Sequence, residues 1–229
     1  SAMTNIGMVL PQPGFWTAAQ ALCQRYGTLL LIDETHTISS GPGGYTRAHG
    51  LQPDLLVLGK PVAGGVPCAV YGCSAEAAAR AEAAKRNAPP GHSGIGTTLT
   101  ANLLTMAAMR ANLAEVMTDA AYAHMFTLAT RLADGLRAMI ARHGLGWCVT
   151  QVGARTEFQF TPTPPRNGSE ADRILNPALE QNIHLYLLNR GLVITPFHNM
   201  MLVCPDTTAD DVDHLVAGMD AFVVDTIAP

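Results

Sequence analysis

The sequence predicts an α/β protein in which part of a large, mostly parallel-sheet domain is followed by a smaller α+β domain. Two apolar runs without alternation, at 28–33 and 53–60, are typical of strands buried on both faces of a parallel sheet. After Gly144 the pattern changes to short strands that alternate with helices. We therefore expect two domains, residues 1–120 and residues 121–229.

Each expected element has a local signal. The segment 13–27 predicts a helix, because Pro13 stands early, apolar residues recur at helical spacing and Gly27 offers a stop. Two further helices should meet near 117–119, where Asp119 is suited to cap the second one. The remaining expected elements are a strand at 66–72, a helix at 74–86, the two helices within 101–143, strands at 147–152, 156–162, 191–196 and 200–205, and helices at 170–190 and 208–227.

Composition narrows the class of protein. Apolar residues make up 48% and charged residues 14% of the chain, which indicates much surface buried inside or against a partner chain and argues against disorder. The net charge is −4 without a basic run, which argues against nucleic acid and anionic membranes as partners. No apolar stretch approaches the length of a membrane span.

The cysteines and the N-terminal segment suggest an intracellular setting. The five cysteines are scattered and odd in number, and no pair has zinc-site spacing, so we expect reduced thiols and no metal site. No signal-peptide pattern is visible, and we expect a cytoplasmic protein. Ser1 and Ala2 ahead of Met3 look like the remnant of a tag, which suggests a fragment.

Two charged side chains follow the two apolar runs, Asp33 after the first and Lys60 after the second. In open parallel sheets, ligands bind outside the carboxyl ends of the strands. A lysine there, among small residues, would be partly desolvated and could form an imine with an aldehyde. A buried Asp33 would need a positive partner such as a protonated pyridine nitrogen. Together they suggest pyridoxal phosphate chemistry, although a plain capping aspartate paired with Lys60 would look the same.

The surrounding residues resemble the class III aminotransferases, which belong to fold type I of the pyridoxal-phosphate enzymes. Residues 29–72 contain D-E-x-H-T, G-G, G-L-x-P-D and G-K-x-x-x-G-G-x-P in the order and spacing of that family. Residues 5–16, 94–113 and 185–221 resemble the segment ahead of the Asp-bearing strand, the G-T landmark that opens a long helix, and the small domain. The motifs D-E-T-H-T and T-P-F-H-N-M-M are most similar to those of the glutamate-1-semialdehyde aminomutase and β-amino-acid aminotransferase branch.

The resemblance implies a role for each matching residue. Lys60 would carry pyridoxal 5'-phosphate as a Schiff base and then act as the general acid/base. Asp33 would hold the pyridine nitrogen protonated. Thr97 would bind the phosphate, in the active site of the neighbouring subunit, or else simply cap a helix. Thr35 stands where many members have Val against the ring. His36 would line the edge of the cofactor or be an interior histidine.

Four further residues are candidates for structural or substrate-binding roles. Glu34 should have a structural hydrogen-bonding role. Arg155 is a candidate clamp for a substrate carboxylate, with a surface ion pair to Glu157 or another acid as the alternative. His198 and Asn199 would approach the substrate mouth or simply form a turn that connects strands.

The resemblance also implies that part of the enzyme is missing from this chain. Members of the family are roughly twice as long, and their N-terminal half supplies a glycine-rich phosphate cradle, an aromatic residue on the ring and much of the substrate pocket. No such loop precedes Asp33. We expect a truncated C-terminal half that binds the cofactor weakly and turns over poorly, from an enzyme that is a homodimer.

Three functions stay open at this point. The first is transamination between an amino donor and a keto acid, with intramolecular transfer of the aminomutase type as the runner-up. The second is a non-catalytic half-enzyme that serves as an assembly module. The third, a dinucleotide-binding domain, is weaker because no G-x-G-x-x-G follows a strand.

Overall fold

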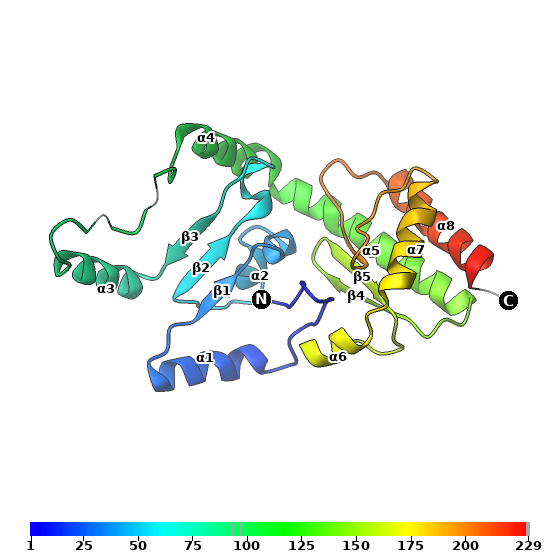
Figure 1. The fold of residues 1–229 in the computed structure, drawn as a ribbon, viewed down its shortest axis with the longest axis horizontal. Coiled ribbons are helices and arrows are strands. Elements are labelled where there is room, and N and C mark those ends of the chain that lie inside the picture. The colour runs from blue at the N-terminus through cyan, green and yellow to red at the C-terminus, as the bar shows by residue number, and fades with distance from the viewer. Residues whose placement is uncertain (93, 97, 228–229) are drawn as a thin grey trace. The chain divides into compact units, whose positions relative to one another are not determined.

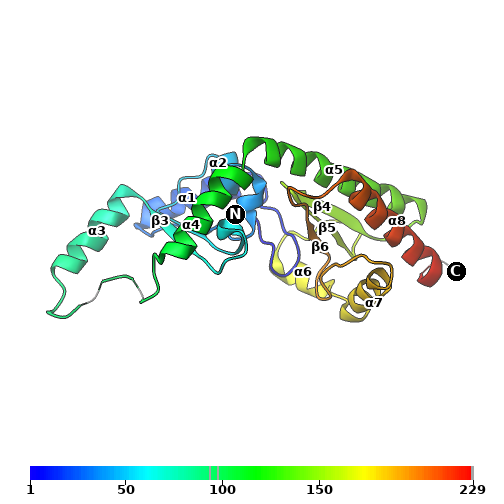
Figure 2. The same cartoon turned by 90° about the horizontal axis from the view of Figure 1, so that it is seen from above.

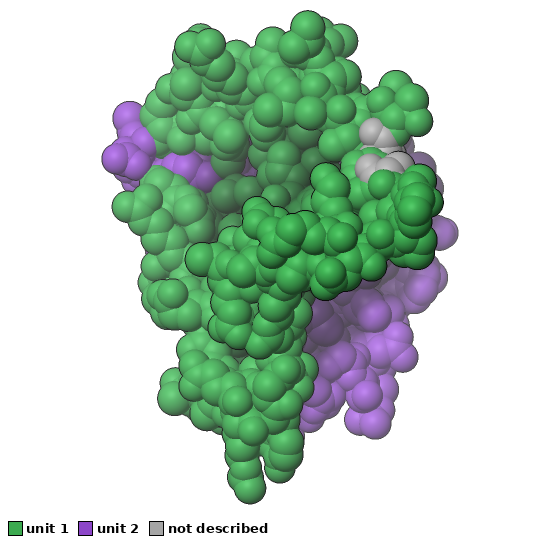
Figure 3. Space-filling model, turned by 90° about the vertical axis from the view of Figure 1, so that its left-hand side faces the viewer, with its two compact units in different colours: residues 1, 13–118 green, residues 2–12, 119–229 purple. Residues whose placement is uncertain are grey.

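The computed structural model describes residues 1–92, 94–96 and 98–227 (Figure 1). The chain forms two compact units, each with its own internal contacts. Unit 1 comprises Ser1 and residues 13–118, and unit 2 comprises residues 2–12 and 119–229, coloured green and purple in Figure 3. The division near Thr118 falls between two helices, but residues 2–12 pack with unit 2, whereas we expected them in the first domain.

The sheet of unit 1 has three strands in the order β1-β2-β3, namely β1 (Leu31–Asp33), β2 (Leu55–Leu58) and β3 (Val70–Cys73). β1 pairs parallel with β2, with Asp33 opposite Val57, but β3 pairs antiparallel with β2. The expectation of parallel strands thus holds for one pair only. The link 59–69 contains a single 3-10 turn, and a parallel connection needs a longer crossover.

The helices of unit 1 carry the expected signals at their ends. Gly27 ends α1 in the left-handed region with φ 61°, and Ser74 caps α3 by accepting from the backbone N–H of Ala77. The helical elements of unit 1 are α1 (Phe15–Tyr26), η1 (Thr37–Ser40), α2 (Gly44–Ala48), η2 (Lys60–Ala63), α3 (Ala75–Arg86), α4 (Leu103–Ala111) and the π-helical turn η3 (Asn112–Val116).

The prediction of strands buried on both faces is wrong for this chain. In β1 only Ile32 is buried, at 1% exposure, while Leu31 is 53% exposed. No residue of α1 or α4, both fully described, is buried. Large apolar side chains of unit 1 are instead exposed: Phe15, Leu22, Tyr26, Leu31, Tyr71, Leu103 and Leu104. The apolar runs predicted burial on both faces of the sheet, but the described elements of unit 1 leave much of that apolar surface exposed.

Unit 2 is a three-stranded antiparallel sheet covered by helices. Its elements are α5 (Asp119–Arg142), β4 (Cys148–Val152), β5 (Arg155–Gln159), α6 (Gly168–Arg173), α7 (Pro177–Leu188), β6 (Met200–Leu202) and α8 (Ala209–Thr226). Figures 1 and 2 show α5 and α8 side by side along the sheet. Gly135 of α5 permits close packing there, since a Cβ on it would lie 2.8 Å from Val216 of α8. Gly218 of α8 instead permits a close approach of α7, since a Cβ on it would lie 3.0 Å from Leu187.

Two expected elements of unit 2 differ in the structure. The single helix at 170–190 is split into α6 and α7, because Pro177 cannot continue a helix and instead begins α7, capped by Asn176. The expected strand at 191–196 is irregular chain rather than a strand. Val193 there is 77% exposed, whereas Leu192 is half-buried and approaches Gly218 of α8, so the run packs through single side chains without joining a sheet.

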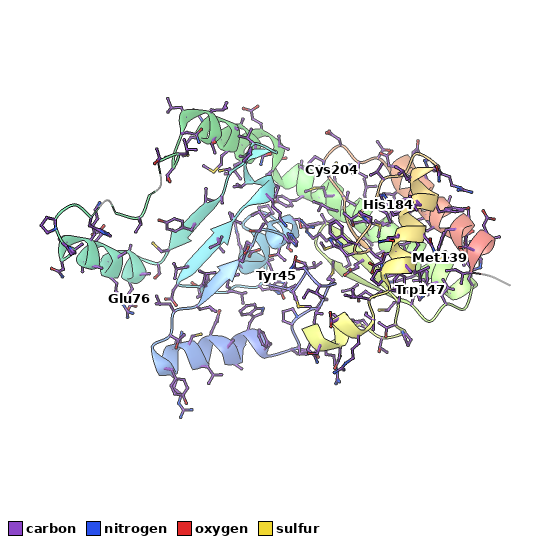
Figure 4. All side chains as sticks on the ribbon, viewed as in Figure 1. Tyr45, Glu76, Met139, Trp147, His184 and Cys204 are labelled. Carbon is purple, nitrogen blue, oxygen red and sulfur yellow. The ribbon has the colours of Figure 1, made fainter. Side chains whose placement is uncertain are left out.

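The core of unit 2 joins its sheet to three helices. Met139 of α5, Phe158 of β5 and Ile183 of α7 are almost fully buried, and the ring of Trp147 stacks on Phe158 with 5.7 Å between centroids. Figure 4 shows the labelled Met139 and Trp147 among these side chains. The other nearly inaccessible members are Leu136, Leu187, Met219, Phe222 and Val223.

Residues 2–12 form a strap that is fixed to this core. The backbone N–H of Met8 donates to the carboxylate of Glu157, and Gln159 Nε2 donates to Met8 O at 3.1 Å. Met8 is fully buried. A buried carboxylate needs donors, and Glu157 obtains one from the strap, which explains why this segment belongs to unit 2.

No helix within the described ranges has the length and apolarity to cross a bilayer.

Candidate functional site

Asp33 and Lys60 lie at the same edge of the unit 1 sheet. Asp33 is the last residue of β1, and Lys60 follows the end of β2 by two residues, at the start of η2. The parallel pairing of β1 with β2 brings both carboxyl ends to one edge, which is where open sheets bind ligands. The charges of Lys60 and His36 act on the Asp33 carboxylate, so the three side chains form one electrostatic cluster.

The backbone of Lys60 is in a conformation that side chains rarely adopt. Its φ is 48°, in the left-handed region, although a glycine stands immediately before it. A non-glycine residue there costs roughly 1–2 kcal/mol. Asn112 of η3 holds the strained turn, because its Nδ2 donates to the carbonyls of Pro61 at 2.8 Å and Val62 at 3.2 Å. The direction of the lysine is therefore set by the fold around it.

The Lys60 amine forms a hydrogen bond with a histidine. Nζ of Lys60 contacts Nε2 of His36, which lies just ahead of η1. Lys60 is exposed and His36 is half-buried. The expectation of a partly desolvated lysine is therefore wrong for this chain, because the edge of the sheet is open to solvent here.

Asp33 is an exposed carboxylate that is held ionised. The backbone N–H of Thr35 donates to Oδ1 of Asp33 at 2.7 Å. Hydrogen bonds from Thr35 lower the pKa of Asp33 from its ordinary value, and the positive charges of His36 and Lys60 lower that pKa further, against a smaller opposing effect of burial. A positive partner was expected for Asp33 if it were buried, and the structure keeps Asp33 accessible at the strand end.

Glu34 anchors the glycine-rich loop that follows β1. Its carboxylate is fully buried and accepts the Thr37 hydroxyl at 2.5 Å, the Tyr45 N–H at 3.1 Å and the Thr46 N–H. Gly44 passes so close that a Cβ there would lie 2.8 Å from Glu34 Oε2. The structural hydrogen-bonding role expected for Glu34 is confirmed by these bonds, which fix the segment that carries His36.

The other candidate residues have separate places. Thr35 is half-buried, and a Cβ on Gly59 would lie 3.4 Å from its hydroxyl, so Thr35 packs beside the residue that precedes Lys60. Thr97 lies outside the described residues. Arg155, at 8% exposure, is the first residue of β5 in unit 2, whereas the sheet edge with Asp33 and Lys60 belongs to unit 1.

Arg155 is an interior residue of unit 2. Desolvation lowers the pKa of Arg155 to about 10, and its Nη1 lies 3.9 Å from the sulfur of Met200. The alternative of a surface ion pair with Glu157 is wrong, since both side chains are buried and Glu157 accepts the Met8 N–H.

His198 lies in the turn before β6, where its Nδ1 faces the Met200 N–H at 3.3 Å. Asn199 is buried in the same turn.

Sequence reasoning missed Asn112 and the contact between His36 and Lys60. Asn112 stands in a helical run without any local signal, and it reaches η2 only through tertiary packing. The histidine was noticed, but nothing in the spacing of residues 36 and 60 indicates that the two side chains meet. The first feature depends on the packing of η3 against η2, and the second on the pairing of β1 with β2, which brings the ends of both strands to one edge.

Comparisons with known proteins identify the family of this chain. The model of the family described as Aminotransferase class-III matches residues 2–224. Glutamate-1-semialdehyde 2,1-aminomutase 2 of Brevibacillus brevis is 32% identical over 209 residues, which are 90% of this chain and 47% of that protein. Glutamate-1-semialdehyde 2,1-aminomutase of Sorangium cellulosum is 36% identical over 193 residues, which are 84% of this chain and 42% of that protein.

Solved structures give the same result for the fold. A glutamate-1-semialdehyde aminomutase variant from Pseudomonas aeruginosa PAO1, in complex with PMP, is 49% identical with a TM-score of 0.94, over 99% of this chain and 51% of that one. A β-phenylalanine aminotransferase from Variovorax paradoxus is 28% identical with a TM-score of 0.83, over 98% and 50%. The predicted α/β fold of type I is confirmed, and this chain spans about half the length of these relatives.

Proposed function

Because the chain belongs to the class III aminotransferase family, we propose that it is part of an enzyme that moves an amino group with pyridoxal 5'-phosphate bound at Lys60. The observation that carries this proposal is the pairing of an ionised carboxylate, Asp33, with the Lys60 amine at one edge of a parallel strand pair. The relatives named for aminomutase and aminotransferase activities support the same reaction class.

The residues present fit this cofactor. Lys60 offers an accessible primary amine for an aldehyde, and Asp33 offers a carboxylate whose lowered pKa keeps it anionic, as a pyridinium partner must be. Thr35, between them in the fold, can pack on a ring, and Thr97 and His36 are the further proposed contacts. When bound, the cofactor supplies an electron sink for the bond that breaks at the substrate carbon.

The chain's own groups would share the remaining work. Lys60 Nζ would bind the cofactor and then, when free, hold the proton that moves to and from the substrate carbon. Its left-handed backbone and the support of Asn112 would keep that amine aimed at one place. Asp33 would fix the orientation of the ring by one charge-assisted hydrogen bond. Arg155 remains a proposed clamp for a substrate carboxylate.

Two versions of amino transfer remain, and the comparisons favour one. The 49% identical structure and the curated relatives above are named glutamate-1-semialdehyde aminomutases, which supports transfer within one substrate. The β-phenylalanine aminotransferase at 28% identity supports transfer from an amino donor to a keto acid. A requirement for an external keto acid separates the two reactions.

We further propose that the whole enzyme is a cytoplasmic homodimer and that this chain alone turns over poorly. Large apolar side chains of unit 1 are exposed, which is expected of a surface that another chain segment or subunit covers. Residues 1–120 and 121–229 would then be parts of the large and small domains, apart from the strap at 2–12. The second candidate function is a non-catalytic assembly module, and the same exposed apolar side chains of unit 1 support it because they offer a surface for another chain.

Trapping tests the proposal directly. The chain is mixed with pyridoxal phosphate, reduced with borohydride, digested and analysed by mass spectrometry. The sequence has only two lysines, so Lys85, which is exposed on α3, serves as the internal reference. We expect the label on Lys60 in the native chain and its loss in Lys60→Ala. Equal labelling of both lysines would contradict a formed site.

A further inference from the structure

Two carboxyl groups lie beneath the strap of residues 2–12 in the interior of unit 2. Glu157 of β5 is 3% exposed and Glu180 of α7 is 4% exposed. Both line one cavity of about 20 Å³, which is large enough for a single water molecule, and Gly7 of the strap forms part of its wall. The strap therefore covers a small polar space that contains two acids.

The strap is attached to this site at Met8 and has little regular structure of its own. The Met8 N–H donates to the Glu157 carboxylate, and Nε2 of Gln159 donates to Met8 O at 3.1 Å. The strap, which is described throughout, forms no helix or strand and contains one isolated bridge between Met3 and Val9. Segments of this kind can open while the rest of a fold stays intact.

The titratable groups at this site belong to the surface that the strap covers, because the strap itself has none. Glu180 faces Glu157 from α7, and His198 lines the same cavity from the turn before β6. On β4, the thiol of Cys148 is neutral, since burial raises its pKa to about 11. On β5, Arg155 precedes Glu157 by two residues and lies 3.9 Å from the sulfur of Met200. The side chains that α6, the residues after it and β6 bring to the site are apolar: Ala171, Ile174, Leu175 and Met200.

A charge on Glu157 is costly while the strap is docked. Burial raises the pKa of Glu157 to about 7 and the charge of Glu180 adds to that shift, whereas the Met8 N–H opposes it. Opening of the strap would admit water to the carboxylate and remove much of this cost. The opposite wall is less free to move, because α7 is anchored by the fully buried Ile183 and Leu187.

We propose that the strap is a pH-sensitive latch of unit 2, which is docked over protonated Glu157 and opens when Glu157 ionises. The proton passes from the carboxyl group to water, and no covalent bond of the chain changes. An exposed glutamate has a pKa of 4.5 and the covered Glu157 has one of about 7, so the ratio of open to docked strap should rise about tenfold between pH 6 and pH 8. This inference concerns unit 2 alone and does not depend on the proposed function.

Hydrogen exchange of the backbone amides, followed by mass spectrometry of the peptides, tests this inference. Measured rates are divided by the intrinsic rates at each pH to give protection factors. We expect the strap amides to be less protected than those in the middle of α5 at both pH values. The protection of the strap should fall about tenfold from pH 6 to pH 8.

Two results with the native chain would overturn the inference. Equal protection of the strap and α5 would show that the strap leaves only when the whole unit unfolds. Constant protection of the strap between pH 6 and pH 8 would show that its opening is not linked to a proton.

Three variants identify the titrating group. Glu157→Gln keeps an acceptor for the Met8 N–H but does not titrate, so the protection of its strap should be the same at pH 6 and pH 8. The matched control is Glu170→Gln, because Glu170 is an acid of the same unit that is ionised at both pH values, and this variant should keep the tenfold fall. A tenfold fall in Glu157→Gln would overturn the inference.

If circular dichroism shows that Glu157→Gln does not fold, Glu180→Gln decides the question. Loss of the neighbouring charge lowers the pKa of Glu157, so the fall in protection should be smaller than in the native chain. A fall of the native size in Glu180→Gln would then overturn the inference.

Discussion

Glu157 should make unit 2 less stable as the pH rises through neutrality. This carboxyl group lies on β5 with 3% of its surface exposed, and burial raises its pKa from the ordinary 4.5 to about 7. The N–H of Met8 opposes that shift, and the nearby carboxylate of Glu180 adds to it. In the native chain a proton is therefore retained that the unfolded chain releases between about pH 4.5 and 7.

The sign and size follow from proton linkage. Where the native state binds more protons than the unfolded state, the free energy of unfolding falls as the pH rises. The contribution is fully present below about pH 4.5 and is lost as the pH rises to about 7. With about 1.4 kcal/mol for each pKa unit, the loss is of the order of 3 kcal/mol.

The perturbation is Glu157→Gln, which keeps an oxygen for the Met8 N–H and removes the charge. For each pH we take the free energy of unfolding of the variant minus that of the native chain. We expect this difference to be roughly 3 kcal/mol more favourable to the variant at pH 8 than at pH 5. Urea unfolding at both pH values gives the free energies. Fluorescence of Trp147 reports on unit 2, since its ring stacks on Phe158, in a Trp16→Phe background.

Glu170→Gln is the matched control in the same unit. The pKa of Glu170 is lowered by its hydrogen bonds with Arg166, so this group is ionised at pH 5 and pH 8 alike. Its variant should show the same difference from the native chain at both pH values. If Glu157→Gln also shows equal differences at both pH values, the reasoning about the buried carboxyl group is refuted.

Three further variants test the turn that carries Lys60 and the loop anchored by Glu34, all by urea unfolding of unit 1. Lys60→Gly should be about 1 kcal/mol more stable than Lys60→Ala, because glycine adopts φ 48° without strain; equal stabilities would contradict the strained turn. Asn112→Ala should destabilise unit 1 by about 1–2 kcal/mol through loss of its bonds to the carbonyls of Pro61 and Val62, and a neutral effect would show that the turn stands without it. Gly44→Ala should lower the free energy of unfolding by about 2 kcal/mol or more, because alanine is strained at φ 68° and its Cβ would meet the carboxylate of Glu34. A variant as stable as the native chain would refute that close contact.

Local signals in the sequence predicted most helices and failed where tertiary packing decides. The stop at Gly27 and the cap at Ser74 are chemical properties of single residues, so α1 and α3 lie close to their expected bounds. The run 191–196 has the composition of a strand, but strand formation needs a partner edge, and the neighbouring β6 pairs with β5 instead. The antiparallel β3 likewise depends on the path of the link 59–69, which composition does not encode.

The sequence by itself determined the family, the α/β fold of type I and the placing of Asp33 and Lys60 at strand ends, because motif order and apolar runs are properties of the chain. Only the tertiary structure decided the environment of those residues. The accessible Lys60 amine, its bond to His36 and its support by Asn112 arise from elements far apart in sequence. Burial and hydrogen-bond partners are set by which surfaces meet in three dimensions, and no local pattern records them.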